Sequence, residues 1–309
     1  MFGRKCNSKY SRSASRRVAG RHVVSRSPRN QVPSLPRGSA LYRGEQATDK
    51  ELANRDEGRP LILLDDAMSK ATGEKFLIAT WIPTEGRKDF RMISERHPRT
   101  TKDGHEAKYR NTGAKERENL FVDLNKAVFE ISDTYDYRNP SDFEKKMPFA
   151  HRKNLDRRAL GYIYQTDLVI REILSRHPGR IDIAMDNPPY DIWDELMQLC
   201  GALIAEGYQI TWYIVTPSGT MQELWIHDYL AGLDRDILED EIEDNPQMHT
   251  QDKNGNQKPM TDALRNSIDG IAKRRVANPD YKGVERKQTP KTDDDKRPKN
   301  ANKGKKARR

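Results

Sequence analysis

The segment Asp186–Tyr190 reads Asp-Asn-Pro-Pro-Tyr and carries the side chains of this chain best suited to chemistry. It directly follows the apolar run Ile181–Met185, which predicts a buried strand. A carboxylate at the tip of a buried strand is costly unless it gains a partner such as a metal-bound water, so Asp186 is a candidate binding or catalytic residue. The same segment also fits a plain helix start, with a proline in the first turn and Asp191 helping to cap it.

The elements around this segment alternate between strand and helix. Apolar residues recur at helical spacing over Ile192–Ile204, a second strand is expected at Ile210–Val215, and a further helix is expected at about 221–233. This order predicts a βαβ unit with a parallel sheet covered by helices. Because ligands bind at the carboxyl ends of such strands, we expect Asp186 and Ser218 at one edge of the sheet.

Earlier in the chain, short apolar runs predict further strands at Pro60–Leu64, Phe76–Trp81 and Leu120–Leu124. The first run ends at two aspartates, and it can form a hairpin with the second because Gly73 lies near the bend. The stretch Leu155–Arg176 has the apolar recurrence of a helix.

These elements predict an α/β domain of three layers with a mostly parallel sheet, of P-loop or Rossmann-like type, over residues 45–245. The acidic run 234–244 is expected to be a solvated helix face. Residues 246–272 are expected to be a polar linker with a short helix, and residues 1–44 and 273–309 to be disordered basic tails.

The charge of the chain is divided between its ends and its middle. The net charge is +9, but residues 1–44 carry +11 and residues 273–309 carry +10, which leaves −12 for residues 45–272. Basic arms on an acidic body suit a protein that holds a polyanion, so we expect the tails to bind nucleic acid. The residues expected to do so are Arg12, Arg16, Arg17, Arg21, Lys303, Lys305, Lys306, Arg308 and Arg309. Simple solvation is an alternative interpretation, and the first tail also fits an organelle transit peptide.

Several classes of function find no support in the sequence. No apolar run is long enough for a membrane helix, and no secretory segment is visible. Cys6 and Cys200 give neither a disulfide framework nor a metal-ligand spacing, and the histidines show no metal spacing either. We therefore expect a cytoplasmic protein that has no membrane partner and no metal site.

The stretch Ile181–Leu233 resembles the second half of ParA/MinD-type P-loop proteins, particularly those of plasmid conjugal-transfer and partition systems. The matching residues are Met185-Asp186-Asn187, Gly207-Tyr208, Ile214-Val215-Thr216 and Ser218-Gly219. The resemblance implies a cofactor site for ATP and magnesium, with Gly86 and Lys88 in the phosphate loop and with Asp123 and Ser218 beside it.

The segment that should be the phosphate loop departs from the family's pattern. A Walker loop needs several glycines around the phosphates, a lysine, and a hydroxyl for magnesium. Here Gly86 is the single glycine, Lys88 is out of place, and Asp89 stands where the hydroxyl belongs. The resemblance therefore implies a nucleic-acid-associated accessory protein of plasmid or phage type that has lost ATP hydrolysis and binds no cofactor. Its partners would be other proteins of a transfer, partition or phage assembly.

An alternative resemblance concerns the segment Asp186–Tyr190 alone, which is similar to the catalytic motif of N6-adenine DNA methyltransferases. The resemblance implies that S-adenosylmethionine is the cofactor, that Asn187 accepts the amine, that Pro188 supplies a carbonyl and that Tyr190 stacks on a flipped base. The sequence has no Gly-x-Gly segment that matches the methyl-donor loop of that family. The sequence leaves both functions open.

Overall fold

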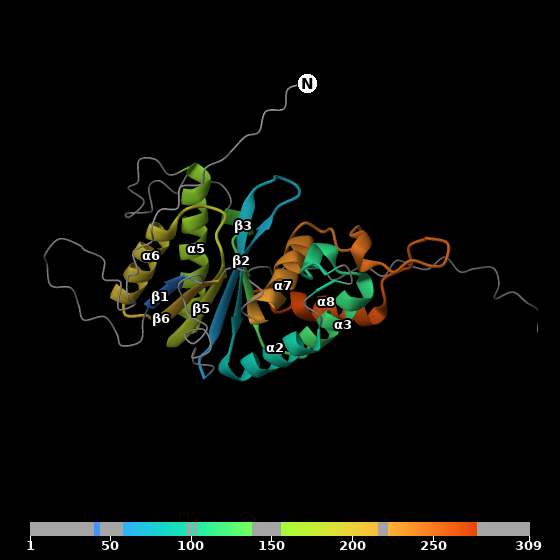
Figure 1. Cartoon of the computed structure of the whole chain (residues 1–309), viewed down its shortest axis with the longest axis horizontal. Coiled ribbons are helices and arrows are strands. Elements are labelled where there is room, and N and C mark those ends of the chain that lie inside the picture. The colour runs from blue at the N-terminus through green and yellow to red at the C-terminus, as the bar shows by residue number, and fades with distance from the viewer. Residues whose placement is uncertain are drawn as a thin grey trace, which may run out of the picture.

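The computed structural model describes residues 40–43, 58–97, 100–101, 104–137, 156–215 and 222–276. In these ranges a central sheet separates two groups of helices (Figure 1). The strands are β1 (Ala40–Arg43), β2 (Leu61–Met68), β3 (Lys75–Ile82), β4 (Glu130–Asp133), β5 (Arg180–Asp186) and β6 (Gln209–Val215). The helices are α2 (Thr84–Arg96), α3 (Ala114–Leu124), α5 (Arg157–Arg176), α6 (Trp193–Ala205), α7 (Gln222–Leu238) and α8 (Asp262–Ala272), with short 3-10 turns η1 (Tyr109–Asn111), η2 (Tyr135–Tyr137) and η5 (Pro246–Met248).

The described strands form one sheet in the order β1-β6-β5-β2-β3-β4. β1, β6, β5 and β2 run parallel to one another, whereas β3 is antiparallel to both β2 and β4. The β2–β3 hairpin turns at Gly73, whose φ of +70° lies in the region that favours glycine. The α/β class, the three layers and the mostly parallel sheet are thus confirmed.

Alternate residues of β2 face opposite layers of the fold. Leu61 and Leu63 belong to the core under α2, α3, α7 and α8, whereas Ile62 and Leu64 belong to the core under α5 and α6. Side chains alternate between the two faces of any strand, so this assignment fixes the direction of the polar residues that follow. Each of these four aliphatic residues is fully buried, as in a strand covered on both faces.

The helices of the two layers pack on the sheet through apolar faces, and capping residues fix where some of them begin. On one side of the sheet lie α5 and α6, and on the other side lie α7, α2, α3 and α8 (Figure 1). α8 begins where Thr261 accepts a hydrogen bond of 3.1 Å from the backbone N–H of Leu264. The side chains of Leu264, Ile268 and Ile271 then enter the core, so the short helix expected in 246–272 is an integral part of the fold.

Two local expectations are wrong. Leu120–Leu124 is the last part of helix α3 and not a strand, because Leu120, Phe121 and Leu124 are spaced to share one buried helix face. The acidic run from residue 234 is not a solvated face either, since Asp234 and Asp236 are 0% exposed. Both occupy the last turns of α7, where partners distant in the sequence surround them.

The fold extends into both segments that were expected to be tails. β1 pairs in parallel with β6, and Arg275 forms a parallel bridge with Ile131 of β4. The tail residues expected to bind nucleic acid lie outside the described residues, and so does Ser218; those tail residues are Arg12, Arg16, Arg17, Arg21, Lys303, Lys305, Lys306, Arg308 and Arg309. None of the helices in the described ranges is long and apolar enough to cross a membrane.

Candidate functional site

Two aspartates on neighbouring parallel strands share one face of the sheet. The β2–β5 register pairs Leu64 with Met185, so Asp65 and Asp186 follow at the same level. Leu63 and Ala184, two residues earlier on each strand, both belong to the core under α7. Because the side-chain period of a strand is two, Asp65 and Asp186 point toward α7 as well.

Helix α7 adds a third aspartate, Asp228. Its neighbour His227 is fully buried and anchors the helix on β3: Nε2 donates to the carbonyl of Ile78 at 3.1 Å, and Nδ1 accepts from the hydroxyl of Thr80 at 3.0 Å. Burial lowers the pKa of His227 to about 4, so the ring is neutral at physiological pH and acts as a structural tether. Asp228 is thereby held within electrostatic range of Asp65.

The segment before and through η1 brings a lysine to the same place. The backbone N–H of Tyr109 donates to the carboxylate of Asp228 at 2.7 Å, and the indole N–H of Trp225 donates to the carbonyl of Ala107 at 2.7 Å. These two bonds tie residues 107–109 to α7. Lys108 lies between them, and its ammonium interacts with Asp228, Glu106 and Asp186.

The three aspartates repel one another and are incompletely hydrated. All three side chains are half-buried. Burial raises the pKa of Asp65 well above its usual range, and the charges of Asp228, Asp66 and Asp186 raise it further. Burial also raises the pKa of Asp186 and that of Asp228, although a backbone hydrogen bond and Lys108 oppose the shift in both. This cluster, Asp65, Asp186 and Asp228, is called the carboxylate triad below.

The other end of the same face shows how a buried aspartate is neutralised. Asp182 on β5 also points toward α7 and is 1% exposed. Two arginines lie beside it, Arg59 at 3.6 Å and Arg87 at 3.5 Å, and Arg87 also approaches Glu223 at 3.7 Å. Charges paired in this way are structural. At the carboxylate triad, Lys108 acts on both Asp186 and Asp228 and Arg110 acts on Asp228, while Glu106 adds a further negative charge, so the carboxylates outnumber the cations.

Oxygen atoms of this kind are the ligands that Mg²⁺ and Mn²⁺ prefer. Within the residues that the structure describes, no three His, Cys, Asp or Glu side chains are close enough to share one ion. Mg²⁺ does not require three, because it keeps several waters and binds through one or two carboxylates together with substrate phosphate oxygens. Each member of the triad has a carboxylate oxygen that accepts no hydrogen bond from the described residues. The triad can therefore bind hard divalent cations, each through one or two of its carboxylates.

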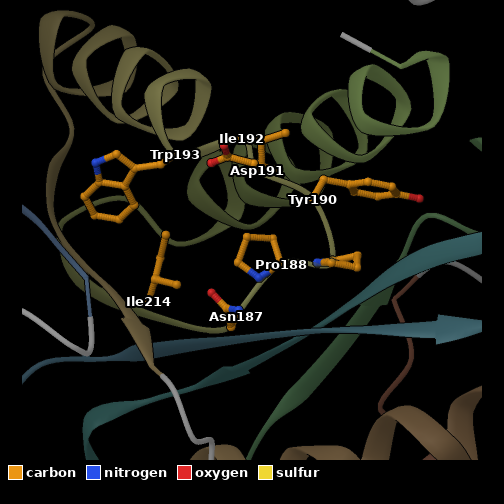
Figure 2. A pocket seen from close by; sticks show the side chains of 8 residues that line it. Asn187, Pro188, Tyr190, Asp191, Ile192, Trp193 and Ile214 are labelled. Carbon is orange, nitrogen blue, oxygen red and sulfur yellow. The ribbon is translucent and has the colours of Figure 1, made fainter. Parts of the chain in front are cut away.

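The predicted loop Asp186–Tyr190 contributes one residue to the triad and forms an adjoining cleft with the rest. Asn187, Pro188, Trp193 and Ile214 line this cleft, which has a volume of about 490 Å³. Figure 2 shows Trp193 and Ile214 on one side of it, with the ring of Tyr190 turned away to the other side. That ring stands edge-on to Tyr162, with centroids 5.7 Å apart.

The other predicted cofactor residues are not brought to the triad. Gly86 and Lys88 lie in the first turns of α2, which directly follows β3. The last residue of β3, Ile82, pairs with Leu61, the first residue of β2. α2 therefore begins at the opposite end of β2 from Asp65. Gly86 is required by packing, since a Cβ there would lie 2.5 Å from the carbonyl oxygen of Val128. The arrangement gives the ATP prediction no support, and this prediction stays open.

Asp123, the remaining described cofactor candidate, is in helix α3. Its carboxylate accepts hydrogen bonds from Lys126 at 2.9 Å and from His97 at 3.2 Å. These local bonds satisfy it on the helix surface, away from the sheet face that carries the triad.

Sequence reasoning missed Asp65, Lys108 and Asp228 as site residues. The available signal for Asp65 was its place in the β2 segment, where a charged residue directly continues an apolar run. Nothing local marks Asp228 or Lys108, because each reaches the site only through the packing of α7 on the sheet and of residues 107–109 on α7.

Comparisons with known proteins do not identify a family for this chain. No protein-family model matches the chain, and no curated protein matches it. A solved structure that is similar to it is the crystal structure of the ribonuclease H2 from Pyrococcus horikoshii OT3. The TM-score is 0.37 and the sequence identity 13%, over 67% of this chain and 84% of that chain.

Proposed function

We propose that this protein is a divalent-metal-dependent phosphodiesterase that hydrolyses nucleic acid at the carboxylate triad. The observation that carries the proposal is the convergence of Asp65, Asp186 and Asp228 from two neighbouring strands and the covering helix, with the pKa of each raised. Clustered carboxylates with perturbed pKa values at the carboxyl ends of parallel strands are typical of functional sites.

The chemistry follows from the charges. Bound Mg²⁺ or Mn²⁺ would supply Lewis acidity and positive charge for an in-line displacement at phosphorus. Asp65 and Asp186, side by side on the sheet, would hold one ion, and Asp228 would hold a second from the helix. Lys108 faces Asp186 and Asp228, so its ammonium can contact the phosphate or the leaving oxygen. Without cations the triad would repel any phosphate.

The charge distribution of the chain supports a polyanionic substrate. Residues 45–276, which include the whole described body after β1, carry −9, whereas residues 1–39 carry +10 and residues 277–309 carry +7. Such basic arms raise the local concentration of nucleic acid, which an acidic body would otherwise repel. The proposal thus gives the arms and the body complementary roles.

Metal binding and cleavage test the proposal directly. Titration calorimetry of the full chain should show Mg²⁺ or Mn²⁺ binding, and end-labelled single- and double-stranded DNA and RNA should be cut only when a divalent cation is present. Asp65→Asn, Asp186→Asn and Asp228→Asn should each lower the rate by at least about 100-fold. Asp123→Asn, purified identically, should cleave like the parent and controls for contaminating nucleases. Cleavage that survives in all three triad variants, or the absence of metal binding, would refute the proposal.

The functions implied by family resemblance differ in the ligand that they need. A ParA-like accessory role, with partners from a plasmid or phage assembly, and an adenine methyltransferase both remain predictions. Calorimetry with ATP and magnesium tests the first cofactor, and calorimetry with S-adenosylmethionine tests the second. Methyl-donor binding that disappears in Asn187→Ala would favour the methyltransferase over the phosphodiesterase.

A further inference from the structure

The cleft beside the triad is lined by an aromatic ring, aliphatic side chains and an amide. Trp193 begins α6 and is half-buried, and Ile214 near the end of β6 and Pro188 provide apolar surface below it (Figure 2). The side chain of Asn187 is exposed at the same edge. The volume of about 490 Å³ lies within the usual range for small-ligand sites.

The cleft begins one residue after the triad, and no member of the triad lines it. Asn187 directly follows Asp186 in the chain, so their Cα atoms are about 3.8 Å apart. Asp186 points toward α7, whereas Ile214 belongs to the core under α5 and α6. The cleft therefore opens over the strand ends on the α6 side, and the carboxylates lie just across the edge of the sheet.

The charges of the cleft select which part of a nucleotide enters it. No lysine or arginine of the described residues lines the cleft, and the carboxylate of Asp191 does. A phosphate would be repelled there, whereas a neutral, planar group with hydrogen-bonding edges would not. Trp193 offers a stacking surface for such a group, and Asn187 offers both a donor and an acceptor.

We propose that this cleft binds an unpaired nucleobase of the strand whose phosphate lies at the triad. The inference rests on the proposed function for the phosphate position, and it adds a preference: single-stranded or locally unpaired nucleic acid binds better than a continuous duplex. A base within an intact duplex is stacked and paired, so it cannot enter the cleft without first leaving the helix.

Tryptophan emission of the full chain provides a direct test that does not depend on cleavage. Trp212 and Trp225 are at most 2% exposed, and Trp81, which is half-buried like Trp193, stacks on His177 with ring centroids 3.5 Å apart. The Trp193→Phe variant therefore reports any quenching that comes from Trp81. A short single strand with a cleavage-resistant phosphorothioate backbone, titrated in Mg²⁺, should quench the wild-type protein and leave Trp193→Phe emission unchanged. An abasic strand of equal length carries the same phosphates and controls for binding by the tails.

Affinity measurements on the variants then separate stacking from charge. Trp193→Leu should weaken binding of the single strand about 5- to 150-fold, as expected for the loss of one base–aromatic stack, and Trp193→Phe should retain most of it. Asn187→Ala, at an exposed position that leaves packing intact, should weaken binding about fivefold. Thermal melting checks that each variant is folded. Binding of the abasic strand should be the same in all of them.

Two outcomes would overturn the inference: equal affinity of Trp193→Leu and wild type for the single strand, or equal quenching by a blunt duplex. Neither bears on metal binding at Asp65, which calorimetry measures separately. Conversely, suppose that the wild-type protein cleaves no nucleic acid and still shows quenching that depends on the base. That result would refute the phosphodiesterase proposal and would support the nucleobase site.

Discussion

Replacing Asp65 by asparagine should make the metal-free protein more stable, although it removes a residue needed for the proposed activity. The reason is electrostatic. Neighbouring strands lie about 4.8 Å apart, so carboxylates at the same level on β2 and β5 are roughly 6 Å apart. At an effective dielectric constant of about 20, two charges at that distance repel by roughly 3 kcal/mol. Partial exposure of the half-buried side chains reduces this to about 1–2 kcal/mol.

The asparagine side chain has the same shape and no charge, so the repulsion from Asp186 and Asp228 disappears. A gain of about 1–2 kcal/mol in the free energy of unfolding corresponds to a rise of about 2–8 °C in Tm for a domain of this size. Thermal melting in EDTA, followed by circular dichroism, measures it. Saturating Mg²⁺ at about 100 times Kd should stabilise the wild type by about 2.7 kcal/mol and should stabilise Asp65→Asn, which lacks a ligand of the first ion, by less.

The pH dependence gives the same prediction a second readout. The pKa of Asp65 is higher in the folded than in the unfolded chain, so the folded state binds more protons between these two pKa values. Metal-free wild type should therefore lose stability as pH rises from about 4 through the raised pKa, and Asp65→Asn should lose less. Because the metal needs the ionised carboxylate, Mg²⁺ affinity should rise over the same window.

Asp123→Asn is the matched control with the opposite sign. Partial burial acts to raise the pKa of Asp123, but the hydrogen bonds from Lys126 and His97 outweigh it and the pKa is lowered. Its removal should slightly destabilise the protein and leave the Mg²⁺ effect intact. If Asp65→Asn melts at or below the wild-type temperature in EDTA, or if Mg²⁺ still stabilises it fully, the electrostatic reasoning about the triad is wrong.

Three further results are expected. Burial and the charge of Asp133 raise the pKa of Asp234 to about 8 despite Arg275, so stability should fall as pH rises from about 4 to about 8, and Asp234→Asn should flatten the Tm–pH curve. Gly232→Ala would place a Cβ 2.3 Å from the ring of Tyr109 and should cost about 1–3 kcal/mol in urea unfolding, whereas Gly201→Ala, with open space around it, should gain about 1 kcal/mol. Removing residues 1–39 and 277–309 should abolish the steep salt dependence of DNA binding in fluorescence anisotropy, where the full chain should show a log–log slope of about −5.

The second half of the sheet could be predicted because its signals are local. In the stretch from β5 to α7, each apolar run is followed by a helical recurrence of adequate length, and the structure confirms the order of strand and helix. The prediction of a strand at Leu120–Leu124 failed because so short an apolar run does not show whether its period is that of a strand or of a helix. The neighbours that decide it are residues of α8, which pack against α3 in three dimensions.

The buried acidic residues at the end of α7 could not be predicted from their own neighbourhood. The hydroxyl of Tyr109 donates to Asp236 at 2.5 Å and the amide of Asn245 at 2.6 Å, while Arg275 contacts both Asp234 and Asp133. These partners come from segments before and after α7. A run of acids is solvated unless such partners are supplied, and the sequence does not show that they are.

The same reasoning explains why only Asp186 was recognised in the triad. It stands in a distinctive segment, whereas Asp65 becomes its neighbour only because β2 inserts between β5 and β3. β2 and β3 form an antiparallel hairpin, and β2 also pairs in parallel with β5. The hairpin therefore joins the parallel strands through β2, which brings Asp65 next to Asp186. Asp228 depends in addition on the tether that His227 makes to β3.

β5 carries the strongest internal argument that the triad is functional. Asp182 and Asp186 lie on the same strand, face the same helical layer and differ in their surroundings. The first is enclosed and matched by two arginines; the second is half-buried, adjoins two more carboxylates and has one lysine nearby. The chain can neutralise an aspartate on this face with two arginines, so the weaker compensation at Asp186 is a local departure from the arrangement at Asp182. Such departures in folded proteins concentrate where a ligand completes the site, and here the missing component is positive charge.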